Sequence, residues 1–488
     1  MKAKKVLALA LSVAMTVAMT GCGAGTATQQ PAEAAGETVE ATEEVTEEVA
    51  EDAEAEGETA EAADASELSY TGLNIDDSTL NGTVATIKFI HHKTDRAEDG
   101  TMDAMVAKFN EEFPGITVEM EAITDYAEDS LLRLSTGDWG DIMFIPAVDK
   151  VDLPTYFMPI DSLENLSEKL NFVNSWEYEG KCYGIPYMAN AQGVLYNKKV
   201  FEDAGITTLP KTPTEFLADL QLIKDNTDAI PLYTNYAAGW TMGAWDAYAG
   251  IVSEGDNTFV NQKFVHTAAP FADNGKDSGI YNLYRILYDA CANGLIEDDY
   301  STTDWESCKG MLNRGEIGTM VLGSWAYAQM QDAGDTPENV GYMPFPMTVD
   351  GKSYVNAGGD YNYCINAQAS DENKLASLIF VKWMVEKSDW CFNEGGYTVV
   401  KGGENPDMYA AFDGCEVLTD EPSLAGEETL LNDMNAESEL SFNAGGDAKV
   451  QRIVEAGATG SETLDDIMND WTAKWNAAQE ELGVEVLY

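Results

Sequence analysis

The chain has 488 residues, of which 85 are Asp or Glu and only 28 are Lys or Arg, so its formal net charge is −57. Such an acidic surface repels nucleic acid and anionic headgroups, which excludes a nucleic-acid-binding protein and disfavours a polyanionic ligand. Ten Trp, 22 Tyr and 16 Phe are enough for a sizeable folded core.

The first residues are typical of an exported protein. A basic stretch precedes an apolar run of fourteen residues, 6–19, which is too short to span a bilayer comfortably. Small residues then precede Cys22, and this pattern resembles a bacterial lipobox with Met19 in place of the usual Leu. We expect 1–21 to be a lipoprotein signal peptide and Cys22 to be the lipid anchor on the outer face of the cell membrane. An ordinary secretory signal is the alternative.

The next segment is one-sidedly acidic. Between residues 23 and 70 there are fifteen Asp or Glu and no Lys or Arg, in a background of Ala, Thr, Gly and Val. This composition offers too little apolar surface to offset the entropy lost on ordering, which predicts disorder. We therefore expect residues 22–81 to contain the anchor cysteine and a disordered tether.

The body begins with alternating strands and helices. The apolar run 84–90 predicts a buried strand, the apolar spacing over 102–109 predicts a helix, and 116–123 predicts the next strand. A further helix around 130–134 leads to a third buried strand at 141–145. This order predicts an α/β sheet with right-handed crossovers, whose ligands bind beyond the carboxyl ends of the strands.

Two later helices are marked by their own residues. Thr212 and Glu215 predict a capping box, with Pro213 in the first helical turn. Near the end of the chain, Trp471 and Trp475 belong to an apolar stripe at helical spacing. We interpret this stripe as core.

Residues 179–205, EGKCYGIPYMANAQGVLYNKKVFEDAG, carry the strongest motif. They resemble the Y-G-(I/L)-P-Y and (L/V)-Y-Y-N-K…F-x-x-A-G block of the carbohydrate solute-binding proteins of bacterial ABC importers, of the maltose and multiple-sugar type. Four further blocks agree in order: STGDWGDIMFIP, GEIGTMVLGSWAYAQM, NAGGDYNYCINAQASDENKLASLIFVKWMVEKSDW and GGYTVV. In the first of these, Gly140 stands where the family has Pro. The resemblance spans about residues 82–480.

This resemblance implies a two-lobe periplasmic-binding-protein fold of type II, with an interlobe cleft and three hinge crossings. The crossings are expected near 192–197, 355–363 and 398–402. Lobe 1 is expected to contain 82–193 with 364–400, and lobe 2 to contain 198–355 with 401–488. The implied function is capture of a sugar or oligosaccharide in the cleft and its delivery to the permease subunits of an ABC importer, by a monomer that touches the membrane only through its lipid anchor.

A sugar needs aromatic platforms for its apolar face and polar side chains for its hydroxyls. Trp325 is the first candidate platform, because it follows a predicted buried strand and matches the family's stacking tryptophan; a core position is the alternative. The other candidate contacts lie in Gly-rich segments or near predicted cleft edges: Trp240, Trp245, Tyr187, Tyr361, Asp360, Asp95 and His92. Asp141 is interpreted as structural. Lys and Arg are nearly absent nearby, which argues against a carboxylate or phosphate ligand.

Two alternatives stay open. A protein of the same fold could bind a peptide or a polyamine, and the acidic surface would suit a polyamine. The enzyme alternative is a secreted glycoside hydrolase with two carboxylates. The sequence has no nucleophile elbow and no His-based triad, so we expect no enzymatic activity.

Metal and cysteine patterns predict little special chemistry. The chain has three His and no HExxH, CxxC or EF-hand pattern, so we expect neither a metal nor a cofactor. Six cysteines follow Cys22 in the chain, and they permit fifteen complete pairings. Because a body of this size does not need stapling, we expect buried free thiols at 182, 291, 308, 364, 391 and 415.

Overall fold

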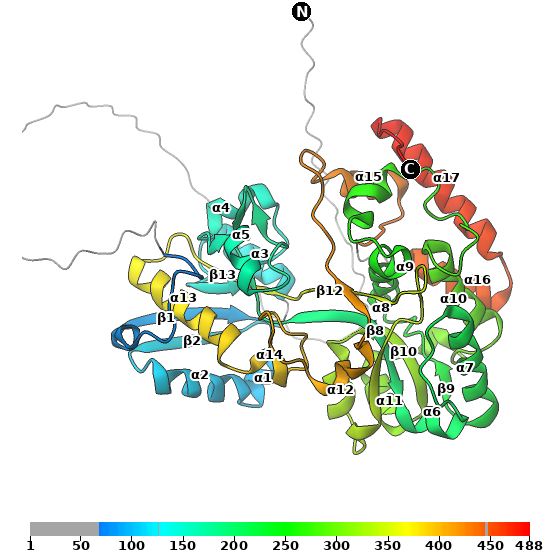
Figure 1. Cartoon of the computed structure of the whole chain (residues 1–488), viewed down its shortest axis with the longest axis horizontal. Coiled ribbons are helices and arrows are strands. Elements are labelled where there is room, and N and C mark those ends of the chain that lie inside the picture. The colour runs from blue at the N-terminus through cyan, green and yellow to red at the C-terminus, as the bar shows by residue number, and fades with distance from the viewer. Residues whose placement is uncertain (1–67, 125, 445–447) are drawn as a thin grey trace, which may run out of the picture. The chain divides into compact units, whose positions relative to one another are not determined.

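The computed structural model of the chain describes residues 68–124, 126–444 and 448–488. Cys22, the predicted signal peptide and the predicted tether up to residue 67 lie outside this part. The described residues form two lobes, each with its own sheet and hydrophobic core (Figure 1). Within these residues, no helix has both the length and the apolar character that crossing a membrane requires.

Lobe 1 is built on a five-stranded sheet. β1 pairs in parallel with β2 and β3, as the predicted alternation requires, and β13 lies antiparallel between β3 and β7. In spatial order the strands are β2 (Ile116–Ala122), β1 (Ala85–His91), β3 (Ile142–Phe144), β13 (Asn362–Ile365) and β7 (Ile185–Pro186). The helices are α1 (Thr94–Glu98), α2 (Thr101–Glu112), α3 (Tyr126–Thr136), α4 (Leu153–Tyr156), α5 (Leu163–Lys169), α13 (Asp371–Glu386) and α14 (Trp390–Asn393). A small sheet has the order β4 (Asp161–Ser162), β6 (Lys181–Cys182) and β5 (Glu177–Tyr178).

Packing on this sheet explains the apolar run in β1. Ile87, Phe89 and Ile90 are fully buried, because α13 packs against β1 and β13 while α2 packs against β2. The prediction of a buried strand at 84–90 is confirmed, with the strand displaced by one residue.

The start of β3 explains why a family position usually held by Pro is Gly here. Gly140 has φ +86°, and a Cβ at this position would lie 2.7 Å from the Cβ of Lys88. Pro cannot adopt this φ, and any side chain would collide with β1. Asp141 next to it accepts hydrogen bonds from the Lys88 N–H and from Asn373 Nδ2, both at 2.9 Å. These bonds confirm the structural interpretation of Asp141.

The segment before β1 belongs to lobe 1. Tyr70 is fully buried; its N–H donates to the Ile160 carbonyl at 2.9 Å, and its carbonyl accepts from Lys382 Nζ at 2.7 Å. Ile75 is also buried, and a short 3-10 helix, η1 (Ser78–Gly82), leads into β1. The folded body therefore begins near residue 68, earlier than the predicted tether boundary at 81. Its aromatic and aliphatic side chains give this segment the apolar surface that the acidic composition before it lacks.

Asp161 joins this segment to the small sheet. Its Oδ2 accepts from the N–H and the hydroxyl of Thr71 at 2.8 and 2.5 Å, and its Oδ1 accepts from Ser162 N–H and Asn165 Nδ2 at 2.8 and 2.9 Å. Although burial alone would raise the pKa of Asp161, these hydrogen bonds hold it below its ordinary value.

We expect Asp161→Asn to lower the free energy of unfolding at neutral pH by about 1 to 3 kcal/mol, because an amide cannot accept all four donors. The folded-state pKa is lowered, so this stability is present above the ordinary Asp pKa of about 4 and is lost as the pH falls through the folded-state value. Urea unfolding at several pH values measures both effects. Asp152→Asn is the control, since Asp152 is exposed and caps no helix with its side chain. A difference from wild type that does not shrink on acidification would contradict this account.

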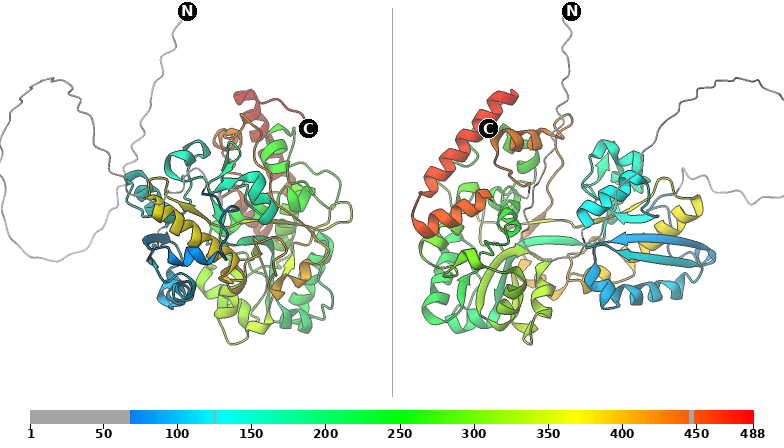
Figure 2. Two further views of the ribbon diagram at one scale, coloured as in Figure 1. Left: turned by 60° about the vertical axis from the view of Figure 1, so that its left-hand side comes forward. Right: turned by 180° about the vertical axis from the view of Figure 1, so that it is seen from behind.

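Lobe 2 is built on a six-stranded sheet. Its path is β14 (Glu416–Leu418), β12 (Tyr354–Gly359), β8 (Ala189–Asn197), β10 (Ile317–Gly323) and β9 (Ile230–Leu232), and β11 (Val340–Pro344) also pairs with β8. The helices are α6 (Lys198–Ala204), α7 (Pro213–Asn226), α8 (Trp240–Gly243), α9 (Ile251–Glu254), α10 (Ile280–Ala292), α11 (Trp305–Arg314), α12 (Ala326–Asp332), α15 (Leu430–Ser438), α16 (Ala448–Thr459) and α17 (Leu464–Leu482). Figure 2 shows α16 and α17, in orange and red, on the side of this lobe away from the β8 crossing.

The chain crosses between the lobes three times, so the predicted two-lobe architecture is confirmed. Along the chain, the buried residues pass from the core of lobe 1 to a core of lobe 2 at 189–191, return to lobe 1 at 357–363, and pass to lobe 2 again at 400–408. The first crossing lies just before the predicted 192–197, because those residues already form the centre of the lobe 2 sheet. Figure 1 shows β8 running from one lobe into the other.

The first two crossings are hydrogen-bonded to each other, and the first is also bonded to the segment that leads into the third. Ala189 exchanges two backbone hydrogen bonds with Tyr397, of 3.1 and 2.7 Å, on one side of β8. On its other side, β8 pairs antiparallel with Ala357–Gly359 of β12. The segments that connect the lobes thus lie side by side as a narrow, hydrogen-bonded ribbon.

The two helices predicted from their own residues are both present. Thr212 Oγ1 accepts from the Glu215 N–H at 3.2 Å at the start of α7, although Glu215 in return accepts from Lys211 N–H rather than from Thr212. Trp471 and Trp475 in α17 are buried, as predicted.

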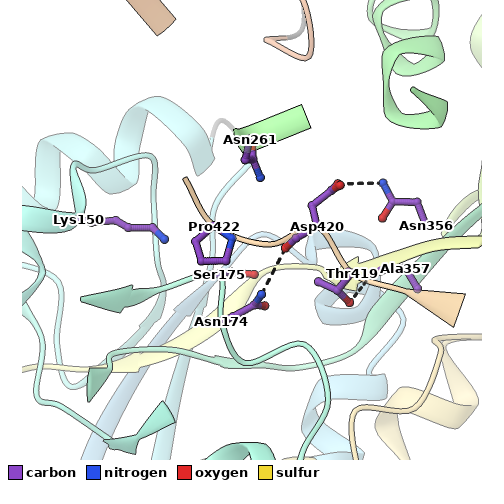
Figure 3. A pocket seen from close by; sticks show the side chains of 10 residues that line it. Lys150, Asn174, Ser175, Asn261, Asn356, Ala357, Thr419, Asp420 and Pro422 are labelled. Carbon is purple, nitrogen blue, oxygen red and sulfur yellow. Dashed lines mark hydrogen bonds between the residues drawn. The ribbon is translucent and has the colours of Figure 1, made fainter. Parts of the chain in front are cut away.

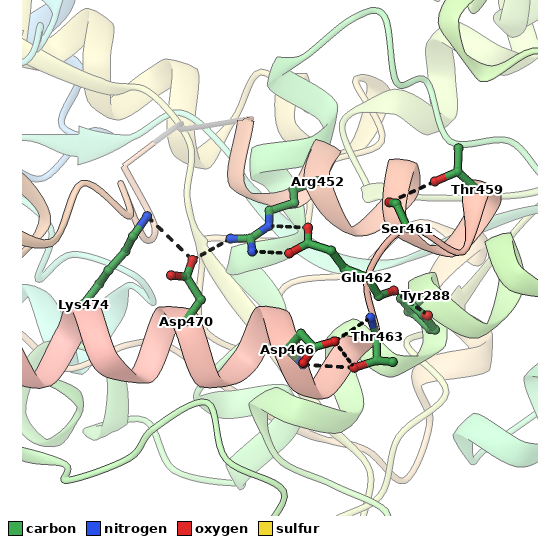
Figure 4. A network of polar contacts seen from close by, with 9 residues as sticks. All are labelled: Tyr288, Arg452, Thr459, Ser461, Glu462, Thr463, Asp466, Asp470 and Lys474. Atoms are coloured by element: carbon green, nitrogen blue, oxygen red, sulfur yellow. Dashed lines mark hydrogen bonds and ion pairs between the residues drawn. The ribbon is translucent and has the colours of Figure 1, made fainter.

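Polar contacts join α16 to α17 (Figure 4). Arg452 pairs with Glu462 through two bonds, of 3.0 and 2.7 Å, and with Asp470 at 2.5 Å. The Arg452 guanidinium lowers the pKa of both carboxyl groups.

All six cysteines of the described chain are free thiols. Cys182, Cys291, Cys308 and Cys364 are buried, whereas Cys391 and Cys415 are partly exposed. Burial raises the pKa of Cys308 to about 12 and that of Cys391 to about 11, so these thiols stay protonated at neutral pH.

Candidate functional site

A pocket of about 270 Å³, here called the interlobe pocket, is lined by both lobes (Figure 3). Lobe 1 contributes Lys150, Asn174 and Ser175, lobe 2 contributes Asn261, Thr419, Asp420 and Pro422, and β12 contributes Asn356, Ala357 and Gly358. Asn174 Nδ2 donates to the Asp420 carbonyl at 3.3 Å, which links the lobes directly. The volume is near the lower end of ligand sites, roughly 300 Å³.

Three indole rings gather on lobe 2 and form what is here called the tryptophan cluster: Trp240, Trp305 and Trp325. The ring centroids lie 5.1 Å apart for Trp240 and Trp305, 5.5 Å for Trp240 and Trp325, and 5.8 Å for Trp305 and Trp325. Trp240 remains 46% exposed, and the other two are half-buried. The cluster therefore leaves aromatic surface open to solvent, although Trp305 and Trp325 also pack against a hydrophobic core of lobe 2.

The end of β10 positions Trp325 next to the hinge. The preceding Ser324 accepts from the Ala191 N–H through its hydroxyl, at 3.0 Å, and its own N–H donates to the Ala191 carbonyl at 3.0 Å. The indole lies against Gly323, where a Cβ would come within 2.7 Å of Trp325 Nε1. Only glycine permits this close approach, so the sequence Gly-Ser-Trp fixes the ring beside the first crossing.

A second pair of rings, His92 and Tyr361, lies in lobe 1. The rings of His92 and Tyr361 are in tilted contact, with centroids 4.2 Å apart and 32° between their planes. Burial lowers the pKa of His92 to about 3, so the imidazole is neutral. Its Nδ1 is buried and has no hydrogen-bond partner among the described residues.

Tyr187, whose ring centroid lies 6.3 Å from that of His92, is hydrogen-bonded to Asp360. The Tyr187 hydroxyl donates to Asp360 Oδ2 at 2.9 Å, and the Tyr187 ring is only 2% exposed. Asp360 directly follows β12, and its side chain is half-buried. Tyr187 therefore orients Asp360 in this structure and does not offer its own ring face.

Two other predicted contacts have different placements. Trp245 is 3% exposed and packs edge-on against Phe345 in the lobe 2 core, so its ring is no accessible platform. The prediction failed here because Trp240 and Trp245 share one Gly-rich segment, and only the packing of lobe 2 distinguishes them. Asp95 lies in α1, beyond the end of β1, but its side chain is outside the described part.

The structure also brings together residues that the sequence analysis missed: Trp305 in the tryptophan cluster, and Lys150, Asn174, Asn356 and Asp420 in the interlobe pocket. Trp305 had one detectable signal, since Asp304 is a typical N-cap and places Trp305 in the first turn of a helix. Asp420 stands in the turn-forming sequence TDEP, and nothing in this sequence indicated that it lines a pocket. In the part of the chain that the structure describes, no three His, Cys, Asp or Glu side chains form a group that could hold a metal ion.

Comparison with known proteins gives consistent matches. Residues 93–389 match the family described as bacterial extracellular solute-binding protein. A curated relative, the multiple sugar-binding protein of Streptococcus mutans, is 24% identical over 312 residues, which cover 61% of this chain and 70% of the relative.

Solved structures match over a larger share. A manno-oligosaccharide specific solute-binding protein of Bifidobacterium animalis subsp. lactis, BlMnBP2 in complex with mannotriose, is 44% identical with a TM-score of 0.77, covering 85% of this chain and 99% of that one. BlMnBP1, an ABC transporter binding protein of the same organism in complex with mannobiose, is 45% identical with a TM-score of 0.76, covering 84% and 99%.

Proposed function

The chain belongs to the bacterial extracellular solute-binding protein family, and we propose that it captures a manno-oligosaccharide between its lobes and delivers it to an ABC importer. The family places it outside the cytoplasm. The two similar solved proteins bind mannotriose and mannobiose, and this chain spans nearly their whole length. We further propose that it acts as a monomer with permease subunits as partners.

The observation that carries this proposal is the tryptophan cluster. Sugar rings present C–H groups on one face, and an exposed indole complements such a face. Trp240 and Trp325 offer this surface next to the hinge, where both lobes can reach a ligand.

The lining of the interlobe pocket disfavours the alternatives. Its polar groups are mainly amides and hydroxyls, with one carboxylate and one ammonium, which suits an uncharged ligand better than a polyamine. The Lys309 ammonium also lies over the Trp305 ring, 4.9 Å from its centroid, where a cationic ligand would be repelled. The similar proteins are binding proteins, and we propose that this chain likewise catalyses no reaction on its sugar.

Calorimetric titration with mannobiose and mannotriose tests the proposal, with spermidine and a tripeptide as competing classes. A ligand at 100 times its Kd should also add about 2.7 kcal/mol of stability in a melting experiment. Chromatography of the recovered sugar then shows whether it is intact. Binding of spermidine alone, or cleavage of the sugar, would replace this proposal with one of the alternatives.

Membrane attachment is proposed to depend on Cys22, because the preceding residues resemble a lipobox. We expect Cys22→Ser to release the protein from the membrane fraction into the soluble fraction without changing its sugar affinity. Immunoblotting of fractionated cells measures the release. Cys415→Ser, at a partly exposed cysteine of lobe 2, is the control and should leave the protein in the membrane fraction. A wild-type protein that is already soluble would remove the lipid anchor from the proposal.

A further inference from the structure

The interlobe pocket differs in kind from the tryptophan cluster, because no aromatic side chain lines it. Its described lining offers amides, hydroxyls, one carboxylate and one ammonium. The two sites share no residue. A ligand held in this pocket is therefore recognised by hydrogen bonds and not by stacking.

Asp420 supplies the carboxylate, and one of its oxygens lacks a donor. Asn356 Nδ2 donates to Oδ2 at 3.1 Å, whereas Oδ1 is buried and has no hydrogen-bond partner among the described residues. Burial raises the pKa of Asp420 to about 6, although the bond from Asn356 opposes this shift. A buried carboxylate oxygen without a donor is unfavourable, so a ligand that brings a donor completes the site.

The segment around Asp420 is held rigidly from lobe 2. Asn261 Nδ2 donates to the Glu421 carbonyl and Gln262 Nε2 donates to the Pro422 carbonyl, both at 2.7 Å. The Glu421 N–H donates to the Asn257 carbonyl at 2.8 Å. The carboxylate is thus positioned before a ligand arrives, which reduces the entropy lost on binding.

We propose that Asp420 is a specificity-determining residue that accepts a hydrogen bond from a hydroxyl of an uncharged sugar unit in the interlobe pocket, a polar subsite distinct from the tryptophan cluster. This inference rests on the proposed function.

Lys150 complements Asp420 across the pocket. Figure 3 shows its side chain extending toward the pocket from lobe 1, while Asp420 lies on the side of lobe 2. An ammonium donates to sugar oxygens, and a carboxylate accepts from sugar hydroxyls. Because the two charges are opposite, they largely cancel in the pocket and favour neither an anionic nor a cationic ligand overall. The pair therefore selects a neutral polyhydroxyl unit.

The test is a thermodynamic cycle that combines Asp420→Asn with mannotriose and a series of its monodeoxy derivatives. We expect Asp420→Asn to raise the Kd for mannotriose about ten- to a hundredfold, as loss of a hydrogen bond to a charged group does. One monodeoxy derivative should bind wild type more weakly by a similar factor but bind Asp420→Asn no more weakly than mannotriose does. Because the variant removes a buried charge, its melting temperature should be equal to or above that of wild type.

Glu421→Gln is the matched control, since Glu421 is the next residue, does not line the pocket, and holds Asn257 Nδ2 at 3.2 Å through an oxygen that Gln retains. It should bind mannotriose with the wild-type Kd. Equal losses along the deoxy series in wild type and Asp420→Asn would overturn the role of Asp420 while leaving sugar binding intact. A wild-type protein that binds no manno-oligosaccharide would instead overturn the proposed function, and this inference with it.

Discussion

Replacing Trp325 by Ala is expected to weaken mannotriose binding about ten- to a hundredfold, with little change in the melting temperature. A sugar ring stacked on the indole removes roughly 60 to 100 Å² of apolar surface from water, which at about 25 cal/mol per Å² corresponds to about 1.5 to 2.5 kcal/mol. The indole is half-buried and packs against Trp240, Trp305 and the edge of a lobe 2 core, so its removal should cost the fold less than removal of a fully buried tryptophan. Calorimetric titration and thermal melting of the same variant measure both quantities.

Trp245→Phe is the matched control for this prediction. Trp245 comes from the same lobe but is 3% exposed, so its truncation should lower the melting temperature and leave the Kd unchanged. If Trp325→Ala instead behaved like this control, with near-normal affinity and a strongly reduced melting temperature, Trp325 would be a core residue. The tryptophan cluster would then no longer support sugar binding.

Replacing Lys449 by Met is expected to lower the free energy of unfolding by about 3 to 5 kcal/mol, because it leaves a buried carboxylate without its counter-ion. Lys449 Nζ lies 2.5 Å from Asp246 Oδ1, and their side chains are 4% and 1% exposed. The Tyr284 hydroxyl also donates to Oδ1, and the Asn443 N–H donates to Oδ2 at 2.8 Å. Urea unfolding of the variant measures the loss.

Two further variants identify the uncompensated charge as the cause. Lys449→Met combined with Asp246→Asn should recover most of the stability, because the remaining amide is neutral and still accepts hydrogen bonds. Lys474→Met removes a lysine from the half-exposed pair with Asp470 at 3.7 Å and should cost less than about 1 kcal/mol. A double variant as unstable as Lys449→Met alone would show that the loss comes from packing of the lysine stem.

Where a local pattern by itself dictates structure, prediction from the sequence succeeded. The apolar run of β1, the cap at Thr212 and the tryptophan stripe of α17 each carry their signal within a few consecutive residues. The order of the family blocks predicted the two-lobe fold and its three crossings. Trp325 could be singled out because Gly-Ser-Trp follows a strand whose burial is visible in the sequence.

The tertiary structure alone decided which side chains meet. Trp240 and Trp245 are five positions apart in the same segment, yet one is exposed beside Trp325 and the other is buried against Phe345. Tyr70, at the end of the acidic segment, belongs to lobe 1. Lys382, more than 300 residues later, lies over its ring and donates a hydrogen bond to its carbonyl.

The interlobe pocket shows the same limit most clearly. Lys150, Asn356 and Asp420 come from three distant parts of the chain, and each stands in a local sequence typical of an ordinary turn or strand. Their chemistry arises because the crossings bring the lobes together and leave one carboxylate oxygen without a donor. The sequence by itself therefore determined the class of fold and singled out Trp325 as a candidate platform, whereas the meeting of the polar side chains in the interlobe pocket depends on long-range packing, which no local pattern encodes.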